Sequence, residues 1–197
     1  MQAIVLASGS IYRQELVSRL GIKFQCISPD IDESAHAGEH AATLAQRLAL
    51  QKAQRAHQLL DTKSTSNTIV IASDQVACVA NKLLGKPLSP TRAVAQLTTM
   101  NGKVVEFHTA LSILNTATGE QFSAIDITYA KLRNLGTDEI ERYIAFDKPF
   151  DCAGSFKMES LGISLFESIK CEDPTALIGL PLIKVCEGLR LFGVSLP

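Results

Sequence analysis

The chain has 197 residues and a formal net charge of -1, and 46% of its residues are hydrophobic. This length suits one domain that buries most of its apolar surface, and the near-neutral charge excludes an electrostatic footprint for nucleic acid or a membrane surface. A signal-peptide pattern and a stretch long enough to span a membrane are both absent, so we expect a cytoplasmic protein that binds neither nucleic acid nor membrane.

The hydrophobic periodicity predicts alternating strands and helices along the chain. Strands are expected at residues 3–7, 23–27, 68–72, 103–115, 121–132 and 163–169, and a continuation of the strand at 68–72 into residues 76–80 is left open. Helices are expected from about 11 to 20, 43 to 60, 90 to 100, 137 to 146 and 181 to 192. Residues 61–67 are polar and are expected to form a surface connection. This order of elements predicts an α/β fold with a mixed sheet.

A serine-rich loop follows the first expected strand. Ser8, Gly9 and Ser10 precede a helix, so free backbone N–H groups, two hydroxyls and the positive end of a helix dipole meet there, with Arg13 one turn further on. Such a loop would hold a phosphate well. The alternative is a plain helix cap, because serines before helices usually serve that purpose.

Asp74 follows an apolar, β-branched run at 68–72 that predicts a strand buried on both faces. Open α/β sheets place their ligands at the carboxyl ends of such strands, which favours a role for this carboxylate at a site. A turn or helix-capping aspartate explains the same residues. This run by itself leaves both interpretations open.

Two cations interrupt the apolar stripe of the helix expected at 43–60. Lys52 and Arg55 fall on the same side of the helical wheel as its leucines. Long side chains that extend to solvent would explain both, whereas an anion in an interior cleft is the interpretation that Lys52, in the middle of the stripe, favours. Lys86, in the turn between Gly85 and Pro87, is equally open between a solvated lysine and an anion ligand.

Carboxylates, rather than histidines or cysteines, are the candidate metal ligands. A hard cation such as Mg²⁺ binds one or two carboxylates together with substrate phosphates, and Asp74 with Glu33 would supply that pair. Asp30 and Asp32 are expected to solvate their loop. The four histidines show no metal-ligand spacing and have no cysteine near them in the sequence, so we expect neither a transition-metal site nor a Cys–His nucleophile.

These pieces, in this order, resemble the Maf-like nucleoside triphosphate pyrophosphatases over nearly the whole chain. The resemblance rests on Leu6–Ser10 with Arg13, on Asp32–Glu33, Lys52–Ala53 and Ser73–Gln75, and on Gly85–Pro87 and Gly179–Pro181. It implies one domain over residues 1–197 with an elongated, two-lobed α/β fold around a central mixed sheet, similar to inosine triphosphate pyrophosphatases. A nucleoside triphosphate would lose pyrophosphate in the cleft between the lobes.

The resemblance also implies roles for individual residues. Asp74 would accept a proton from water, and Glu33 and Asp74 would hold a divalent metal cation, Mg or Mn. The triphosphate is implied as a small-molecule substrate, and a homodimer is left open. The residues implied to bind substrate phosphates are Ser8, Ser10, Arg13, Lys52 and Lys86.

Three further positions resemble the 7-methyl-GTP pyrophosphatase branch of the family, namely Tyr12, Gln75 and Glu159 in the stretch 152–159. Methylation at N7 leaves guanine cationic, so Tyr12 would stack on the base and Glu159 would accept from its N–H groups. Each residue has a structural alternative: a half-exposed aromatic, a turn amide and a solvated charge. Two other functions remain open, a dTTP/UTP pyrophosphatase of the same family and a non-hydrolysing, nucleotide-binding regulator of cell division.

Overall fold

The computed structural model describes residues 2–60 and 67–196. Its strands are β1 (Ala3–Ala7), β2 (Gln25–Ile27), β3 (Thr68–Val79), β4 (Lys82–Leu84), β5 (Val104–Asn115), β6 (Gln121–Leu132) and β7 (Phe166–Lys170). Its α-helices are α1 (Ile11–Ser18), α2 (Ala41–Leu59), α3 (Pro90–Met100), α4 (Thr137–Asp147) and α5 (Leu182–Leu191). Short 3₁₀ helices occupy Ala153–Ser155, Leu161–Leu165 and Ala176–Ile178.

The predicted helices and long strands are confirmed, with ends that shift by a few residues. The strand predicted at 163–169 differs in its first part, which is a 3₁₀ helix, so that the extended part, β7, begins only at Phe166. Residues 61–66 of the predicted surface connection lie outside the described residues. In residues 2–60 and 67–196, we find no helix that combines the length and the apolar character of a membrane span.

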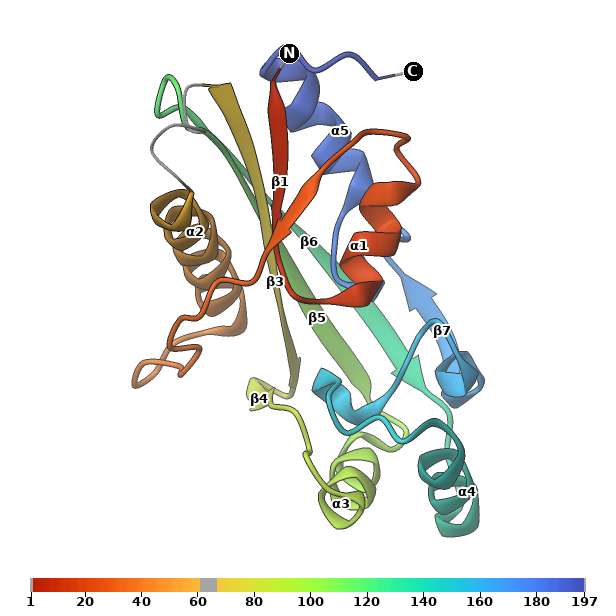
Figure 1. Ribbon diagram of the computed structural model, residues 1–197. Coiled ribbons are helices and arrows are strands. Elements are labelled where there is room, and N and C mark those ends of the chain that lie inside the picture. Colours follow the sequence, from red (N-terminus) through yellow and green to blue (C-terminus); the bar gives the residue numbers. More distant parts are fainter. Residues whose placement is uncertain (1, 61–66, 197) are drawn as a thin grey trace.

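The described strands form one mixed sheet in the order β2-β1-β3-β5-β6-β7, with β4 paired to β3. Strand β1 is parallel to both β2 and β3, and the other pairs are antiparallel. The predicted α/β fold with a central mixed sheet is therefore confirmed. Figure 1 shows that β3, β5 and β6 run through the length of an elongated molecule, from the end near α2 and α5 to the end near α3 and α4.

Strand β3 continues without a break from Thr68 to Val79, and this changes the position of Asp74. Strand β1 pairs with residues 68–71 of β3, β4 pairs with residues 77–79, and β5 pairs with β3 along almost its whole length. Asp74 is therefore in the middle of β3 and not at its end. The polar residues at 73–75 suggested an end, but the pairing with β5 continues through them, and only the opposite edge of β3 is open there.

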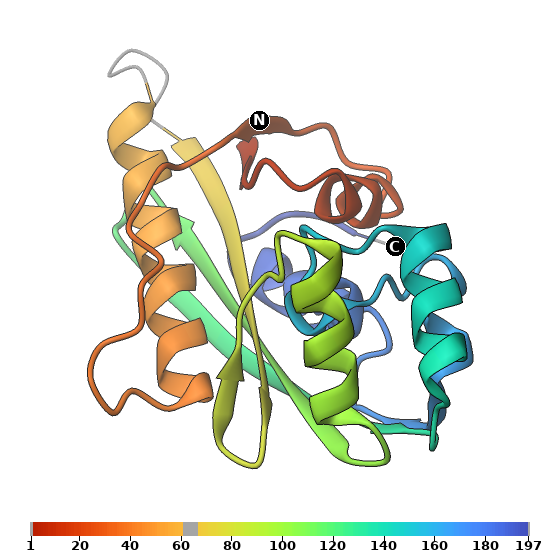
Figure 2. The ribbon, with the colours of Figure 1, turned by 90° about the horizontal axis from the view of Figure 1, so that it is seen from below.

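The two faces of the sheet are covered by different helices. Figure 2 shows α2 on one side of the sheet and α1, α3, α4 and α5 on the other. Side chains alternate along a strand, so Val70, Ala72, Val76 and Cys78 of β3 pack in the cores that include α2 residues. On the other face, α1 and α5 contribute to one core cluster, and α3 and α4 contribute to a second one. Asp74 shares the parity of the residues that face α2.

Candidate active site

A cavity of about 1180 Å³ opens along the free edge of β3. Its wall is built by the loop between β1 and α1, the loop before α2, the middle of α2 and of β3, the turn after β4, the loop at 151–159 and residues 177–179. All the site residues that the sequence suggested line this one cavity, although they come from distant parts of the chain. They are Ser8, Ser10, Tyr12, Arg13, Glu33, Lys52, Asp74, Gln75, Lys86 and Glu159.

Lys52 lies between two carboxylates at the floor of the cavity. Its Nζ atom is 2.5 Å from Asp74 Oδ1 and 2.6 Å from Glu33 Oε1. The apolar stripe of α2 packs on the face of the sheet towards which Asp74 projects, and this packing carries Lys52 into the interior. Lys52 and Asp74 are buried, whereas half of the Glu33 side chain is exposed. Of the two cations in the stripe, only Lys52 is buried, since Arg55 is exposed and donates to Gln58.

The environments of the two carboxylates separate their pKa values. Burial raises the pKa of Asp74, the positive charges of Lys52 and Arg13 oppose this rise, and the charge of Glu33 adds to it. Burial also raises the pKa of Glu33, but the hydrogen bond and charge of Lys52, with Lys86 and Arg13, outweigh it, so the pKa of Glu33 is lowered. Asp74 is therefore the better proton acceptor of the pair.

The serine loop caps α1, as the simpler of the two interpretations predicted. Ser10 is the N-cap residue, and its Oγ accepts from the Arg13 backbone N–H at 3.5 Å. Ser8 Oγ accepts from the backbone N–H of Ser10 at 3.1 Å and from Arg13 Nη1 at 3.4 Å. Capping and phosphate binding are compatible here, because the first turn of a helix has several N–H groups and the cap satisfies only some of them.

The carbonyl of Gly179 joins the first and last parts of the chain beside the cavity. It accepts from Arg13 Nε at 2.8 Å and from Ser73 Oγ at 2.9 Å. Gly179 has a φ of 119°, which favours glycine, and a Cβ there would lie 3.2 Å from Arg13 Nε. The orientation of the Arg13 guanidinium group thus depends on a residue that is 166 positions away.

Gln75 has a structural task that the sequence did not reveal. Its Nε2 atom donates to the carbonyl oxygens of Ala176 and Leu177 at 2.9 and 3.1 Å, and to Thr109 Oγ1 at 3.0 Å. These bonds fix the segment that lines the cavity at 177–179. The amide nitrogen is therefore fully used by the protein, and only the amide oxygen of Gln75 is left for a ligand.

Tyr12 and Glu159 meet at another part of the cavity wall. Burial raises the pKa of Tyr12 to about 12, and the nearby charges of Glu159, Cys152 and Asp151 and a hydrogen bond to Glu159 contribute. Asp151, which the sequence analysis did not single out, also lines the cavity. Its position directly before the stretch 152–159 is the signal that would have identified it. Two carboxylates therefore lie close to one aromatic ring.

Lys86 lies in the turn after β4, lines the cavity and is exposed to solvent. Its charge contributes to the lowered pKa of Glu33, so the two side chains are within electrostatic reach of each other. An exposed lysine on a turn keeps the freedom to approach a bound anion.

The carboxylates fit the hard divalent cation that the sequence implied. Glu33 and Asp74 both direct an oxygen at the position of the Lys52 ammonium, so the protein already brings two anionic oxygens around one positive charge. Mg²⁺ and Mn²⁺ take oxygen ligands and complete their shell with water and substrate phosphates. Asp32, as predicted, serves its own loop, because its Oδ1 accepts from the Ser34 N–H at 2.9 Å.

The fold also brings together a Cys–His pair that the sequence did not suggest. The sequence shows no cysteine near a histidine, yet the fold brings Cys78 Sγ to within 3.7 Å of His108 Nε2, and Glu106 Oε2 lies 3.1 Å from the same nitrogen. The sequence did not suggest this contact because it depends on strand pairing. Cys78 on β3 lies opposite Glu106 on β5, and Glu106 and His108 share a face of β5. The spacing Glu-x-His in an expected strand was the available signal.

Comparisons with known proteins identify similar sequences and a similar fold. Residues 3–192 match the family model described as Maf-like protein. The chain is 45% identical over 197 residues to a protein of Xanthomonas axonopodis pv. citri that is named 7-methyl-GTP pyrophosphatase, and 47% identical over 198 residues to a protein of the same name from Pseudomonas syringae pv. syringae. Each match covers 100% of both chains.

Two further similarities concern the activity class and the fold. A protein of Acinetobacter baylyi that is named nucleoside triphosphate pyrophosphatase is 46% identical, over 98% of this chain and 97% of the relative. The structure of the Staphylococcus aureus Ham1 protein superimposes with a TM-score of 0.53 at 16% identity, over 95% of this chain and 99% of that one. At this identity the likeness concerns the fold alone.

Proposed function

The chain belongs to the Maf-like protein family, and we propose that it is a nucleoside triphosphate pyrophosphatase that hydrolyses 7-methyl-GTP to 7-methyl-GMP and diphosphate. Relatives that match the full length of the chain carry this activity in their names. A substrate of this kind belongs to the nucleotide pool of the cytoplasm, where we propose that the enzyme removes modified nucleotides.

The distribution of charge in the cavity is the observation that carries the proposal. One group of side chains, Arg13, Lys52 and Lys86, offers positive charge beside Asp74 and Glu33. A second group places Tyr12 next to the carboxylates of Glu159 and Asp151. A triphosphate suits the first group. A cationic base suits the second, because both an aromatic face and carboxylates attract positive charge.

Asp74 is the general base in this proposal. It accepts a proton from a water molecule, whose oxygen attacks the α-phosphorus as the bond between that phosphorus and the α–β bridging oxygen breaks. The products are the nucleoside monophosphate, which keeps the water oxygen, and diphosphate. The raised pKa of Asp74 supports this role, since a carboxylate that holds a proton more strongly accepts it more readily from water.

The cations hold the triphosphate for this attack. Lys52 and Arg13 are positioned by hydrogen bonds inside the cavity, and Lys86 approaches from the exposed turn. Backbone N–H groups of the loop from Ser8 to Ser10 add donors at the positive end of α1. Donors fixed in advance stabilise the charge that develops on the phosphate oxygens without having to reorganise during the reaction.

Glu33 and Asp74 would hold the divalent cation, Mg²⁺ or Mn²⁺. When bound, this ion polarises the phosphoryl oxygens and neutralises charge on the diphosphate that leaves. Asp74 has two carboxylate oxygens, so one can face the cation while the other faces the attacking water. In the absence of substrate, the Lys52 ammonium lies between the two carboxylates. In the complex with substrate, a phosphate oxygen would be an alternative acceptor for its protons.

Tyr12 and Glu159 select the base. We place the N7-methylated ring against the face of Tyr12, with the base N1–H and N2–H groups donating to Glu159. Gln75 contributes by fixing the segment at 177–179, and its amide oxygen is left for a ligand. Uracil and thymine carry no positive charge, so their attraction to Tyr12 and Glu159 would be weaker.

A panel of triphosphates tests the proposal. The purified protein is given 7-methyl-GTP, GTP, dTTP and UTP at equal concentrations with Mg²⁺ or Mn²⁺, and release of diphosphate and of each monophosphate is measured. We expect the highest kcat/KM for 7-methyl-GTP, and ¹⁸O from labelled water in the monophosphate. Preference for UTP or dTTP would contradict the base assignment, and nucleotide binding without hydrolysis in any metal would make the protein a binding regulator.

A further inference from the structure

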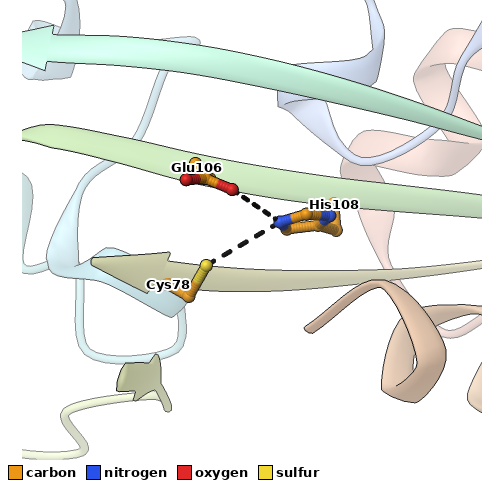
Figure 3. A group of neighbouring side chains, drawn as sticks. All are labelled: Cys78, Glu106 and His108. Atoms are coloured by element: carbon orange, nitrogen blue, oxygen red, sulfur yellow. Dashed lines mark hydrogen bonds and ion pairs between the residues drawn. The ribbon is translucent and has the colours of Figure 1, made fainter. Parts of the chain in front are cut away.

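Cys78, Glu106 and His108 form a cluster on the central sheet that the proposed reaction does not use. Figure 3 shows the three side chains directed at one another, Cys78 from β3 and the other two from β5. His108 Nε2 lies 3.7 Å from Cys78 Sγ and 3.1 Å from Glu106 Oε2, and the ligand atoms of all three lie within 4.8 Å of one another. Cys78 and His108 are buried, and 39% of the Glu106 side chain is exposed.

In either neutral tautomer of His108, hydrogen bonds within the cluster leave one of its polar contacts unfavourable. If Nε2 of His108 carries the proton, it donates to Glu106 and the thiol finds no acceptor at the same nitrogen. If Nε2 is bare, it accepts from the thiol, but its lone pair then faces the Glu106 carboxylate. The other ring nitrogen, Nδ1, is buried without a partner among the described residues, so it does not orient the ring. The contacts at Nε2 therefore determine where His108 points.

A metal ion would satisfy all three groups at once. Around a tetrahedral zinc ion with bonds of about 2.0–2.3 Å, two ligand atoms lie about 3.4–3.6 Å apart. The two distances measured at His108 Nε2 lie close to this range. The partly exposed Glu106 side chain has the freedom to close the third distance, and its solvent side leaves a fourth position open for water.

We propose that Cys78, Glu106 and His108 bind a divalent transition metal ion of the Zn²⁺ class, at a site separate from the carboxylate pair of the active site. A thiolate and an imidazole prefer a softer ion than the oxygen ligands of Glu33 and Asp74, so the two sites differ in the metal that they select. On binding, the thiol proton passes to solvent and the sulfur lone pair forms the metal bond. Nε2 of His108 binds through its lone pair in the neutral tautomer whose proton is on Nδ1, and a proton on Nε2 would first pass to solvent.

The location of the site suggests that it supports the fold. It joins two paired strands, and Cys78 belongs to the core cluster in which Ala41 and Leu44, near the start of α2, also pack. Asp74 and Cys78 share a face of β3, four residues apart along the strand. An ion that ties β3 to β5 beneath the start of α2 therefore stabilises the folded state in proportion to its binding.

Cobalt titration of the full-length protein tests the proposal. After removal of metals with a chelator, Co²⁺ is added and the absorption spectrum is recorded. We expect one equivalent to produce the visible bands of tetrahedral Co²⁺ with a sulfur-to-cobalt charge-transfer band, and one equivalent of Zn²⁺ to abolish both. Zn²⁺ should also raise the Tm of the chelated protein and lose this effect in Cys78→Ser, whereas Mg²⁺ at the same concentration should leave the Co²⁺ bands unchanged.

Variants separate this site from other thiols and from the active site. Cys78→Ser should abolish the charge-transfer band, and Glu106→Gln, at a partly exposed position where folding is not at risk, should weaken Co²⁺ binding at least tenfold. Cys26→Ser, at an exposed cysteine on β2, and Glu33→Gln should leave the band unchanged. A spectrum without the sulfur band in the wild-type protein, or the same band in Cys78→Ser, would overturn the proposal.

Discussion

The Lys52 ammonium donates to Asp74 Oδ1 at 2.5 Å, across the interface where α2 packs on β3. This contact joins a helix cation and a strand carboxylate that are 22 positions apart in the chain. Burial raises the pKa of Asp74, and the opposite charge of Lys52 reduces this rise without cancelling it.

Asp74→Asn should abolish hydrolysis while the fold and nucleotide binding remain. The amide has nearly the same shape as the carboxylate but accepts no proton, and loss of a general base typically lowers kcat by about 10²–10⁴-fold. Diphosphate release measures kcat, and circular dichroism and nucleotide titration test fold and binding. Asp32→Asn, in an exposed turn, is the matched control and should keep normal turnover. If Asp74→Asn also turns over normally, Asp74 is not the base.

Removing the charge of Lys52 and removing the charge of Glu33 should shift the acid limb of the pH profile of kcat/KM in opposite directions. The base must be deprotonated, so activity falls as the pH falls through its pKa, and burial places this fall above the range of an ordinary aspartate. Lys52→Met removes a charge that lowers the pKa, so the limb should move to higher pH. Glu33→Gln removes a charge that raises it, so the limb of the remaining activity should move to lower pH.

The pH profile of kcat/KM at saturating metal provides the measurement for both variants. Arg55→Gln is the matched control for Lys52, because Arg55 lies on the same helix but is exposed and away from Asp74. Its profile should overlay that of the wild-type protein. Shifts of the same sign in the Lys52 and Glu33 variants would show that another group controls the acid limb.

Gln75→Leu should loosen the wall of the cavity. Its amide donates to the carbonyl oxygens of Ala176 and Leu177, and an apolar residue would leave both without this donor. We expect the free energy of unfolding in urea to fall by about 1–3 kcal/mol. Hydrogen exchange at Ile178 and Gly179 should accelerate as well. Gln54→Leu, at an exposed position on α2, should change neither quantity, and unchanged exchange in Gln75→Leu would argue against the anchoring role.

Glu159→Gln should weaken the preference for the methylated base. Removing one carboxylate beside Tyr12 reduces the attraction for a cationic ring, while uncharged guanine loses less. We expect the ratio of kcat/KM for 7-methyl-GTP to that for GTP to fall by about tenfold, which corresponds to about 1.4 kcal/mol. The control is Glu167→Gln, at an exposed position on β7, which should keep the wild-type ratio. An unchanged ratio in Glu159→Gln would place the base elsewhere.

Much of the fold was accessible from the sequence because secondary structure depends on local periodicity. The run at 68–72 predicted a buried strand and the leucine stripe predicted α2, and both are confirmed. The placement of Asp74 at a strand end was wrong, since the polar residues at 73–75 resemble the end of a strand when the partner strand is unknown. Pairing with β5 through these positions is a long-range property that no local pattern encodes.

The sequence by itself determined the elements, the candidate residues and the family that they resemble. Only the tertiary structure decided which atoms meet: Lys52 with Asp74, Arg13 with Gly179, and Cys78 with His108. These contacts depend on how α2 docks and on strand register, and a shift of one residue would turn each strand side chain to the opposite face. The residue types thus determine which chemistry is possible, and the packing of the elements determines the geometry of the site.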